Sequence, residues 1–332
     1  MSAQHHNSID LRVHRFAVMT SCVALLPITV GALVTTLKAG MAFADWPTSD
    51  GQNMLLYPWL NDMRNTDKFV EHGHRLAGVL IGIVSIALVV VAFAFERRTW
   101  VRTMACAILV AVIAQGLLGG MRVIANEQVL AMTHSITGGL FFTLTFLFAG
   151  LTKPRSSTRI ESGTDSTGTN ETVTMSSTAI GLALILPLAV LGQYVLGGMF
   201  RHLGRMLHEH VAGAIGVTLV AVTVAAVTYR SGLPSLQRSA KLIVAALAVQ
   251  VALGLGAWVT KLGFAQFGWV ASVNSPAQNV VCTLHAVGGM LLLATSTGLA
   301  VESCRLLASG HITLLPAGFN GELTQKRQGG VA

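Results

Sequence analysis

Eight long apolar segments alternate with short polar ones along almost the whole chain. Each apolar segment has about twenty residues, which is the length that a helix needs to cross a hydrocarbon layer of ~30 Å. The pattern predicts eight transmembrane helices, at residues 16–37, 73–95, 103–123, 128–151, 178–200, 207–229, 240–260 and 281–303. We therefore expect an all-α integral membrane protein.

The first apolar segment has an alternative interpretation, because Arg12 and Arg15 precede it and Ala42 and Ala44 follow it. A cleaved secretory signal peptide has the same order of basic, apolar and small residues. The apolar region of a signal peptide is shorter, at about 7–15 residues. The length of the segment favours an uncleaved first helix.

A polar segment, 153–177, separates the first four apolar segments from the last four. It is rich in serine, threonine, glycine and charge, and such a composition cannot bury enough apolar surface to fold alone. We expect a flexible cytoplasmic linker there. The predicted divisions are an N-terminal four-helix half at 1–152, a C-terminal four-helix half at 178–306 and a cytoplasmic tail at 307–332.

The two halves echo each other in sequence. The run from Ala114 to Gly120 recurs loosely as Val249 to Gly256, and the surroundings of His134 resemble those of His285. The echo predicts a repeated four-helix unit, with the eight helices arranged as two pseudo-symmetric bundles. A glycine follows each of these histidines by about one turn, and it would serve either close helix packing or a flat ligand against the backbone.

Composition supports the membrane class and sets the orientation. Hydrophobic residues make up 52% of the chain and charged residues 11%, which lies outside the range of soluble globular proteins. Fourteen of the 22 lysines and arginines fall in alternate loops and at the termini, so both termini are predicted to face the cytoplasm. The net charge of +8 then reflects topology and contact with anionic lipid, and no basic segment interleaved with aromatic residues indicates nucleic-acid binding.

Four histidines at matched positions are the main candidates for chemistry. They are His74, His134, His208 or its neighbour His210, and His285, each near the start of an apolar segment. The predicted topology puts all of them at the non-cytoplasmic ends of the second, fourth, sixth and eighth helices, at one depth. A single histidine at a helix end is ordinary, but paired imidazoles at one depth suit bis-histidine ligation of haem. A relay for protons or metal ions is the alternative.

The sequence leaves open which histidine of the sixth helix corresponds to those of the other helices. His208 and His74 each lie twenty-two residues before the cytoplasmic end of their helix, so depth mildly favours His208, whereas a gapped match of the His-x-His-x-Ala-Gly type favours His210. Covalent haem attachment is excluded, because no Cys-x-x-Cys-His occurs. The four cysteines, Cys22, Cys106, Cys282 and Cys304, lack metal-type spacing and are expected to be free thiols.

Charged residues near these histidines add a possible acid–base group. Glu71 precedes His74 by three residues, which puts both on one helix face, and the two could act together in proton transfer. Alternatively, Glu71 is an acidic residue at a helix start, where the helix dipole stabilises its charge, and it has no role in proton transfer. Arg75, Arg122 and Arg201 flank the same surface and could pair with haem propionates or with lipid headgroups.

The chain resembles the haem A synthase family over nearly its whole length. The run from Val34 to Gly40, leading to Ala44-Asp45-Trp46-Pro47, is similar to the first-loop signature of that family. Glu71-x-x-His74-Arg75 is similar to its second-helix motif, and the contexts of His134 and His285 fit as well.

The resemblance implies a haem A synthase, which oxidises a methyl group of haem O to a formyl group by successive hydroxylations for the maturation of haem-copper terminal oxidases. The N-terminal half would bind haem O as the substrate, and the C-terminal half would keep haem b as a cofactor. The residues implied are Glu71, His74 and His134 for catalysis, with His74 and His134 flanking the substrate iron, and His208 or His210, His285 and Arg75 for cofactor binding, with the histidines as iron ligands.

The implied surroundings are a lipid bilayer, an electron-transfer partner of unknown identity and a haem O synthase that docks nearby. A bacterial plasma membrane is favoured over a mitochondrial inner membrane, because the chain shows no recognisable organelle-targeting extension. The long external segment, 38–70, could cap a haem edge, receive a partner or anchor the chain with its aromatic residues.

The chain departs from the family pattern in two places. Many members carry a cysteine pair in the first external loop, and the stretch from Ala42 to Gly51 has none. An expected His-Arg couple in the sixth helix appears as His208-Glu209-His210. The rival functions are a di-haem cytochrome that only transfers electrons and a transporter built on the repeat.

Overall fold

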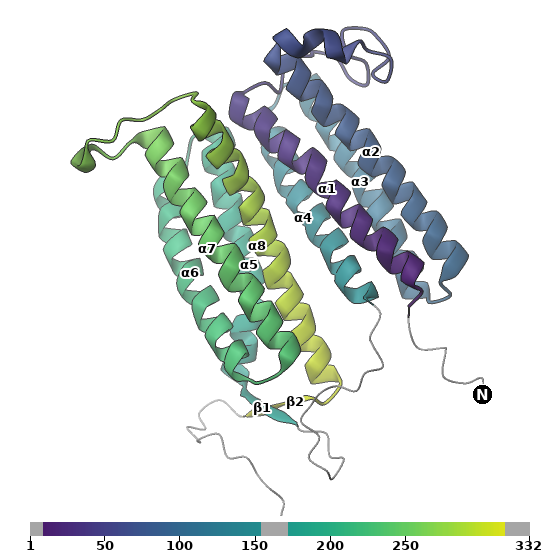
Figure 1. Cartoon of the computed structure of the whole chain (residues 1–332), viewed down its shortest axis with the longest axis vertical. Helices are drawn as coiled ribbons and strands as arrows, with labels where there is room; N and C mark the ends of the chain where they lie inside the picture. Colours follow the sequence, from purple (N-terminus) through teal and green to yellow (C-terminus); the bar gives the residue numbers. More distant parts are fainter. Residues whose placement is uncertain (1–8, 154–171, 316–332) are drawn as a thin grey trace, which may run out of the picture.

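The computed structural model describes residues 9–153 and 172–315, and within these residues the fold is helical (Figure 1). Eight of the described helices are long and apolar enough to cross a membrane, as predicted. They are α1 (Leu11–Leu37), α2 (Thr66–Phe95), α3 (Thr99–Ala125), α4 (Gln128–Thr152), α5 (Ser177–Leu203), α6 (Leu207–Arg230), α7 (Pro234–Leu262) and α8 (Pro276–Ala308). Two 3₁₀-helices, η1 (Trp59–Arg64) and η2 (Ala265–Phe267), lie in the loops after α1 and α7.

The helices pack as two sets of four. In the first set α1 and α3 each contact both α2 and α4, and in the second set α5 and α7 each contact α6 and α8. The sets meet where α1 and α4 contact α8 and where α4 contacts α5. Helices α2 and α3 therefore lie on one outer side of the molecule, and α6 and α7 lie on the other (Figure 1). The two predicted groups of four helices agree with this packing, and their pseudo-symmetry stays a prediction.

The helices are longer than the apolar segments that predict them. Helix α2 begins at Thr66 instead of residue 73, and α7 begins at Pro234 instead of residue 240. The Asn65 side chain accepts the backbone N–H of Lys68 at 3.3 Å and caps α2, while proline at the first position of α7 needs no partner for its nitrogen. Because capped helices continue beyond the hydrocarbon layer, hydropathy places their starts too late. His74 therefore lies two turns inside its helix and not at its mouth.

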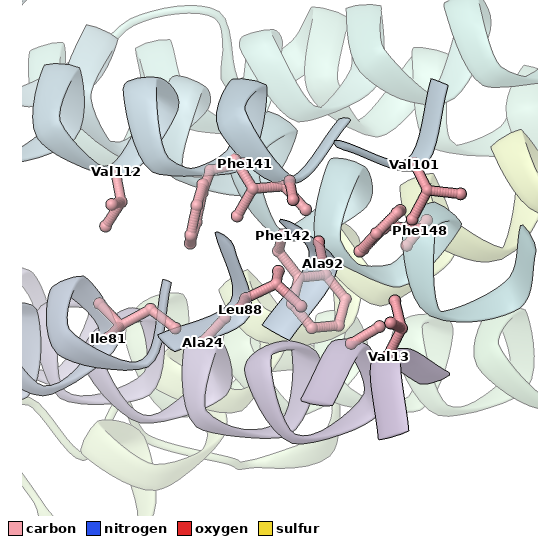
Figure 2. Close-up of a cluster of buried hydrophobic side chains, with 14 of the residues drawn as sticks. Val13, Ala24, Ile81, Leu88, Ala92, Val101, Val112, Phe141, Phe142 and Phe148 are labelled. Carbon is pink, nitrogen blue, oxygen red and sulfur yellow. The ribbon is translucent and has the colours of Figure 1, made fainter. Parts of the chain in front are cut away.

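Apolar side chains fill the centre of the first set of helices (Figure 2). Leu88, Ile108 and Phe148 are fully buried, and Phe141 and Phe142 of α4 join them. Lipid tails are as apolar as these side chains, so close packing holds the helices together more than removal from water does. A second cluster with Leu186, Leu236, Ile243 and Leu299 occupies the other set.

A short parallel sheet joins the ends of the second set. Strand β1 (Val173–Ser176) pairs with β2 (Ile312–Leu315), with Val173 opposite Ile312. Most of the predicted linker at 153–177 and of the predicted tail at 307–332 falls outside the described residues. Their described ends pair with each other, so the start of α5 is tied to the end of α8.

Candidate functional site

Each of four histidines on an even-numbered helix lies against a glycine of the helix before it. A Cβ added at Gly31 of α1 would lie 2.7 Å from Cε1 of His74, which is closer than real Cβ atoms approach. The corresponding pairs are Gly119 with His134 at 3.1 Å, Gly197 with His210 at 3.0 Å and Gly254 with His285 at 3.0 Å. Glycine at these positions therefore leaves the space that each imidazole occupies. We call Gly31, Gly119, Gly197 and Gly254 the glycine seats.

The four rings form two pairs of nearly equal geometry. The ring centroids of His74 and His134 are 6.1 Å apart with an interplanar angle of 83°. Those of His210 and His285 are 6.2 Å apart, also at 83°. The first pair lies within α1–α4 and the second within α5–α8, as expected from the sequence.

The spacing of each pair fits two imidazoles that share one metal ion. A metal–imidazole nitrogen bond is about 2 Å long and the nitrogen lies about 1 Å from the ring centre, so two rings on opposite sides of one ion have centres about 6 Å apart. Apart from these pairs, the described residues hold no cluster of three or more histidine, cysteine, aspartate or glutamate side chains suited to a metal ion. Two ligands per site suit haem, which supplies the other four nitrogens from its own ring.

Backbone carbonyls orient the histidines. Nδ1 of His74 lies 2.9 Å from the carbonyl oxygen of Pro27, four residues before Gly31. An imidazole that donates its Nδ1–H to a carbonyl presents Nε2 as the ligand, and this second contact fixes the ring. The backbone of Gln115 faces His134, and the backbone of Gln250 faces His285. Each of these glutamines lies four residues before the glycine beside its histidine. Nδ1 of these two rings, however, completes no hydrogen bond.

Glutamine side chains fill the space beside the glycines that follow the histidines. A Cβ added at Gly213 would collide with Oε1 of Gln193, and one added at Gly288 would collide with Oε1 of Gln250. Nε2 of Gln193 also lies 2.9 Å from Nδ1 of His210 and donates to the carbonyl of His210 at 2.7 Å. A side chain at Gly213 or Gly288 would therefore displace a glutamine of the preceding helix. Whether the glycines after His134 and His285 also accommodate a flat ligand stays a prediction.

The geometry favours His210 over His208 as the partner of His285. The His210 ring faces His285, whereas His208 is exposed to the surroundings of α6. Helix α6 starts at Leu207, so His208 lies in its first turn. The role of His210 as an iron ligand stays a proposal.

Two variants test this choice directly. We expect His210→Ala to weaken haem binding at the second pair about 100-fold or more, since an axial ligand counts for at least as much as the outer contacts of a metal site. His208→Ala should leave binding unchanged and serves as the matched control. Absorbance spectra of the purified variants measure the effect, and loss of the haem in the His208 variant alone would contradict the assignment.

Glu71 is held in place by partners other than His74. Its side chain is buried, Oε1 accepts from Nη2 of Arg75 at 2.9 Å, and Oε2 accepts from the backbone N–H of Ala42 at 2.7 Å and of Phe43 at 3.4 Å. Nη1 of Arg75 donates to the carbonyl oxygens of Asp45 and Thr48. Glu71 therefore forms its contacts with Arg75 and the loop and not with His74, and the ion pair of Glu71 and Arg75 anchors the loop between α1 and α2.

The loop between α1 and α2 packs on the helix ends near the first histidine pair. The Trp46 ring lies directly against Gly120, the residue after the glycine beside His134, and the guanidinium of Arg122 lies against Gly40. Phe43 is fully buried. The loop thus covers the helix ends at this site.

Polar contacts also order the outer part of this loop. The Asp45 carboxylate accepts the backbone N–H groups of Asp50 and Gly51. Burial of the Asp45 carboxylate by itself raises its pKa. Hydrogen bonds from Thr48 and from these N–H groups outweigh that effect and lower the pKa of Asp45 below its ordinary value. The Tyr57 hydroxyl donates to Asp62 at 2.6 Å, which raises the pKa of that phenol.

Arg201 lies at the junction of the two sets of helices. Its guanidinium donates to the carbonyl of Ala32 and the hydroxyl of Thr36 on α1, and to the carbonyl of Cys282 on α8 at 3.2 Å. The ion pairs of the described residues do not include Arg201 or Arg122. The pairing of either cation with carboxylates of a bound molecule stays a prediction.

Several residues of the site were not recognised in the sequence. The glycine seats Gly31, Gly119 and Gly197 are among them, and so is His202, which lies 3.1 Å from the Ser135 hydroxyl beside His134. A signal for the seats was present, since Gln-x-x-Leu-Gly occurs at 115–119, 193–197 and 250–254.

These features define a class of protein, namely a helical multi-pass membrane protein built around two partly buried histidine pairs. A family model described as Cytochrome oxidase assembly protein matches residues 60–208. The chain is 30% identical to a Heme A synthase of Cereibacter sphaeroides over 152 residues, which cover 40% of this chain and 38% of that protein. It is 33% identical to a Heme A synthase of Paracoccus denitrificans over 132 residues, covering 37% and 33%.

A Heme A synthase of Methylobacterium radiotolerans is 25% identical over 153 residues, which cover 43% of this chain and 41% of the relative. The matches thus span 33–41% of the length of these relatives. Over the matched part of the chain they confirm the resemblance to the haem A synthase family. The matched family region includes Glu71, His74 and His134 and ends before His210 and His285.

Proposed function

We propose that the protein is a haem A synthase, an oxidoreductase that converts a methyl group of haem O to a formyl group by successive hydroxylations. One observation carries the proposal: two histidine pairs, at 6.1 and 6.2 Å, each have the spacing of bis-histidine ligation. The relatives named Heme A synthase add the substrate class. The two pairs correspond to one haem as substrate and one as cofactor.

The first pair is the proposed substrate site and the second the proposed cofactor site. His74 and His134 hold haem O between α2 and α4, and His210 and His285 hold haem b between α6 and α8. When bound, haem b supplies a one-electron redox centre whose potential depends on its ligands and surroundings. The carbonyl of Pro27 keeps His74 in the orientation that presents Nε2 to the substrate.

Ionisable side chains support the choice of the first pair as the reactive one. Glu71 lies three residues before His74 and Arg75 one residue after it, whereas the matched positions around His210 are Leu207 and Val211. A reaction that releases protons needs groups that accept them or stabilise charge, while a permanent redox cofactor does not. The carboxylate of Glu71 assists the oxidation in this proposal, and Arg75 holds that carboxylate.

The proposed setting is a bacterial plasma membrane with both termini in the cytoplasm. The eight helices and the bacterial relatives support a multi-pass membrane protein, and the distribution of lysine and arginine supports the orientation. A haem O synthase that delivers the substrate and an electron-transfer partner complete the proposed surroundings.

A di-haem electron-transfer cytochrome is the second candidate, and the near-identical geometry of the two pairs favours it. Extraction of haem from protein purified with a haem O source distinguishes the two. Haem A or its hydroxylated precursor is expected for the synthase, whereas haem B alone from correctly folded protein would overturn the proposed function.

The role of Glu71 can be tested by two substitutions. We expect Glu71→Ala to stop methyl oxidation while the haem b spectrum of the second pair persists, because Arg75 loses its partner and the loop loses its acceptor. Breaking a buried ion pair of this kind costs about 3–5 kcal/mol. The measurement is the yield of haem A together with the haem b spectrum.

Glu71→Gln separates anchoring from chemistry. Glutamine can accept the N–H groups of Ala42 and Phe43 through its carbonyl oxygen, but it carries no charge and takes up no proton. Normal haem A production by this variant would show that Glu71 acts only as an anchor. Normal production by Glu71→Ala would remove Glu71 from the proposed mechanism altogether.

A further inference from the structure

An apolar groove runs between α2 and α3 on the outer side of the first set of helices. It has a volume of about 230 Å³, and its lining residues are Gly78, Gly82, Ile86, Leu109, Val112 and Ile113. None of these side chains carries a polar atom. A ligand that fits there is a hydrocarbon chain.

The groove begins one helical turn, about 6 Å, beyond His74 along α2. Gly78 and Gly82 follow His74 by one and two turns of α2, and Val112 lies two turns before Gly119, which seats His134. From Gly78 to Ile86 the helix rises about 12 Å. A chain that leaves the histidine site can therefore continue along this groove into the membrane.

The space beside the glycines is open. A Cβ added at Gly78 or Gly82 would have no atom within 4 Å outside its own helix. Gly78 is exposed and Ile113 has 54% of its surface exposed, so the groove opens toward lipid. The opposite side of this four-helix set, at α1 and α4, is covered by α8. The two glycines lie four and eight residues after His74 on α2. The corresponding residues after His210 on α6 are Ala214 and Thr218.

We propose that this groove holds the isoprenoid side chain of haem O, an inference that rests on the proposed function. Haem O and haem B share the same iron-binding ring and differ chiefly in the hydroxyethylfarnesyl chain that only haem O carries. Two histidine pairs of equal geometry cannot separate the two haems by ligation alone. A hydrocarbon groove beside the first pair gives that pair a contact that haem B cannot make.

The test is a comparison of the affinity of the first histidine pair for haem O and for haem B. Purified protein with haem b already bound at the second pair is titrated with each haem in detergent, and binding is followed by absorbance. Wild-type protein should prefer haem O by about tenfold or more, the usual discrimination by a hydrocarbon pocket. Gly82→Leu, which fills the groove from α2, should reduce that preference by about tenfold while the affinity for haem B is unchanged.

Gly216→Leu is the matched control, because Gly216 of α6 is exposed and also has open space beside it. It should leave the preference unaltered. An unchanged preference in Gly82→Leu would overturn the groove assignment without affecting the proposed function. A wild-type protein that shows no preference, with a lipid acyl chain in the groove, would overturn it as well.

A second variant covers the case in which Gly82→Leu binds neither haem at the first pair. Ile113→Trp fills the groove at an exposed position of α3, which carries none of the four histidines. Loss of the haem O preference in this variant supports the proposal, and a retained preference rejects it. Failure of wild-type protein to convert haem O at all would instead count against the proposed function.

Discussion

Replacing His285 with alanine should remove the haem b of the second pair. His285 and His210 are the two imidazoles that face each other there in the described part of the chain, and their ring centres lie 6.2 Å apart. Loss of one axial ligand leaves a single imidazole on α6 and an open space on α8. We expect affinity for haem b to fall about 100-fold or more and the bis-histidine absorbance spectrum of that site to disappear.

His311→Ala is a suitable control, since His311 lies outside α8 and its Nδ1 contacts the Ser309 hydroxyl. It should keep the full spectrum. An unchanged bis-histidine spectrum in the His285 variant would reject the ligand assignment for the second pair, whatever the activity of that variant.

The second large effect is expected at Gly31, which the sequence did not single out. A Cβ there would lie 2.7 Å from Cε1 of His74, so Gly31→Val must displace the ring from its present position opposite His134. A displaced ring cannot share an ion with its partner. Binding of haem O at the first pair should fall by about tenfold or more, with a cost in stability of about 1–3 kcal/mol from overpacking.

Gly150→Val provides the comparison, because a Cβ at Gly150 near the end of α4 meets no atom within 4 Å. Spectra of both variants, with haem b present at the second pair, separate local damage from general misfolding. Equal haem O binding by the Gly31 variant and wild-type protein would show that this glycine does not seat the ligand.

Much of the fold could be predicted because the bilayer leaves few choices. Each apolar segment of about twenty residues becomes a helix, since no other backbone structure satisfies its hydrogen bonds within lipid. The spacing of those segments put His74 and His134 in the first half and His285 in the second, but His74 lies two turns inside α2 and not at its end. The start of α2 was predicted seven residues too late, because its first turns are polar and the Asn65 cap lies in the loop.

Side-chain partners were harder to predict, because they depend on how neighbouring helices rotate. Whether His208 or His210 faces His285 is decided by where α6 begins, and Met206 adopts a left-handed conformation with φ of 67° just before it. Helical spacing indicated that Glu71 and His74 share a face. It could not indicate that Ala42 and Phe43 would bring their N–H groups to the carboxylate from a loop 29 residues earlier.

The glycine seats have a consequence for assembly of the protein. In each case a histidine and its seat belong to consecutive helices, so a helical hairpin such as α1–α2 or α3–α4 already carries one complete half of a binding site. Two hairpins must meet before the site exists, and a bound haem would then join them across the bundle. Synthesis without haem should therefore loosen the contact between hairpins while each hairpin keeps its own structure, which makes haem supply a step in building the protein as well as in its chemistry.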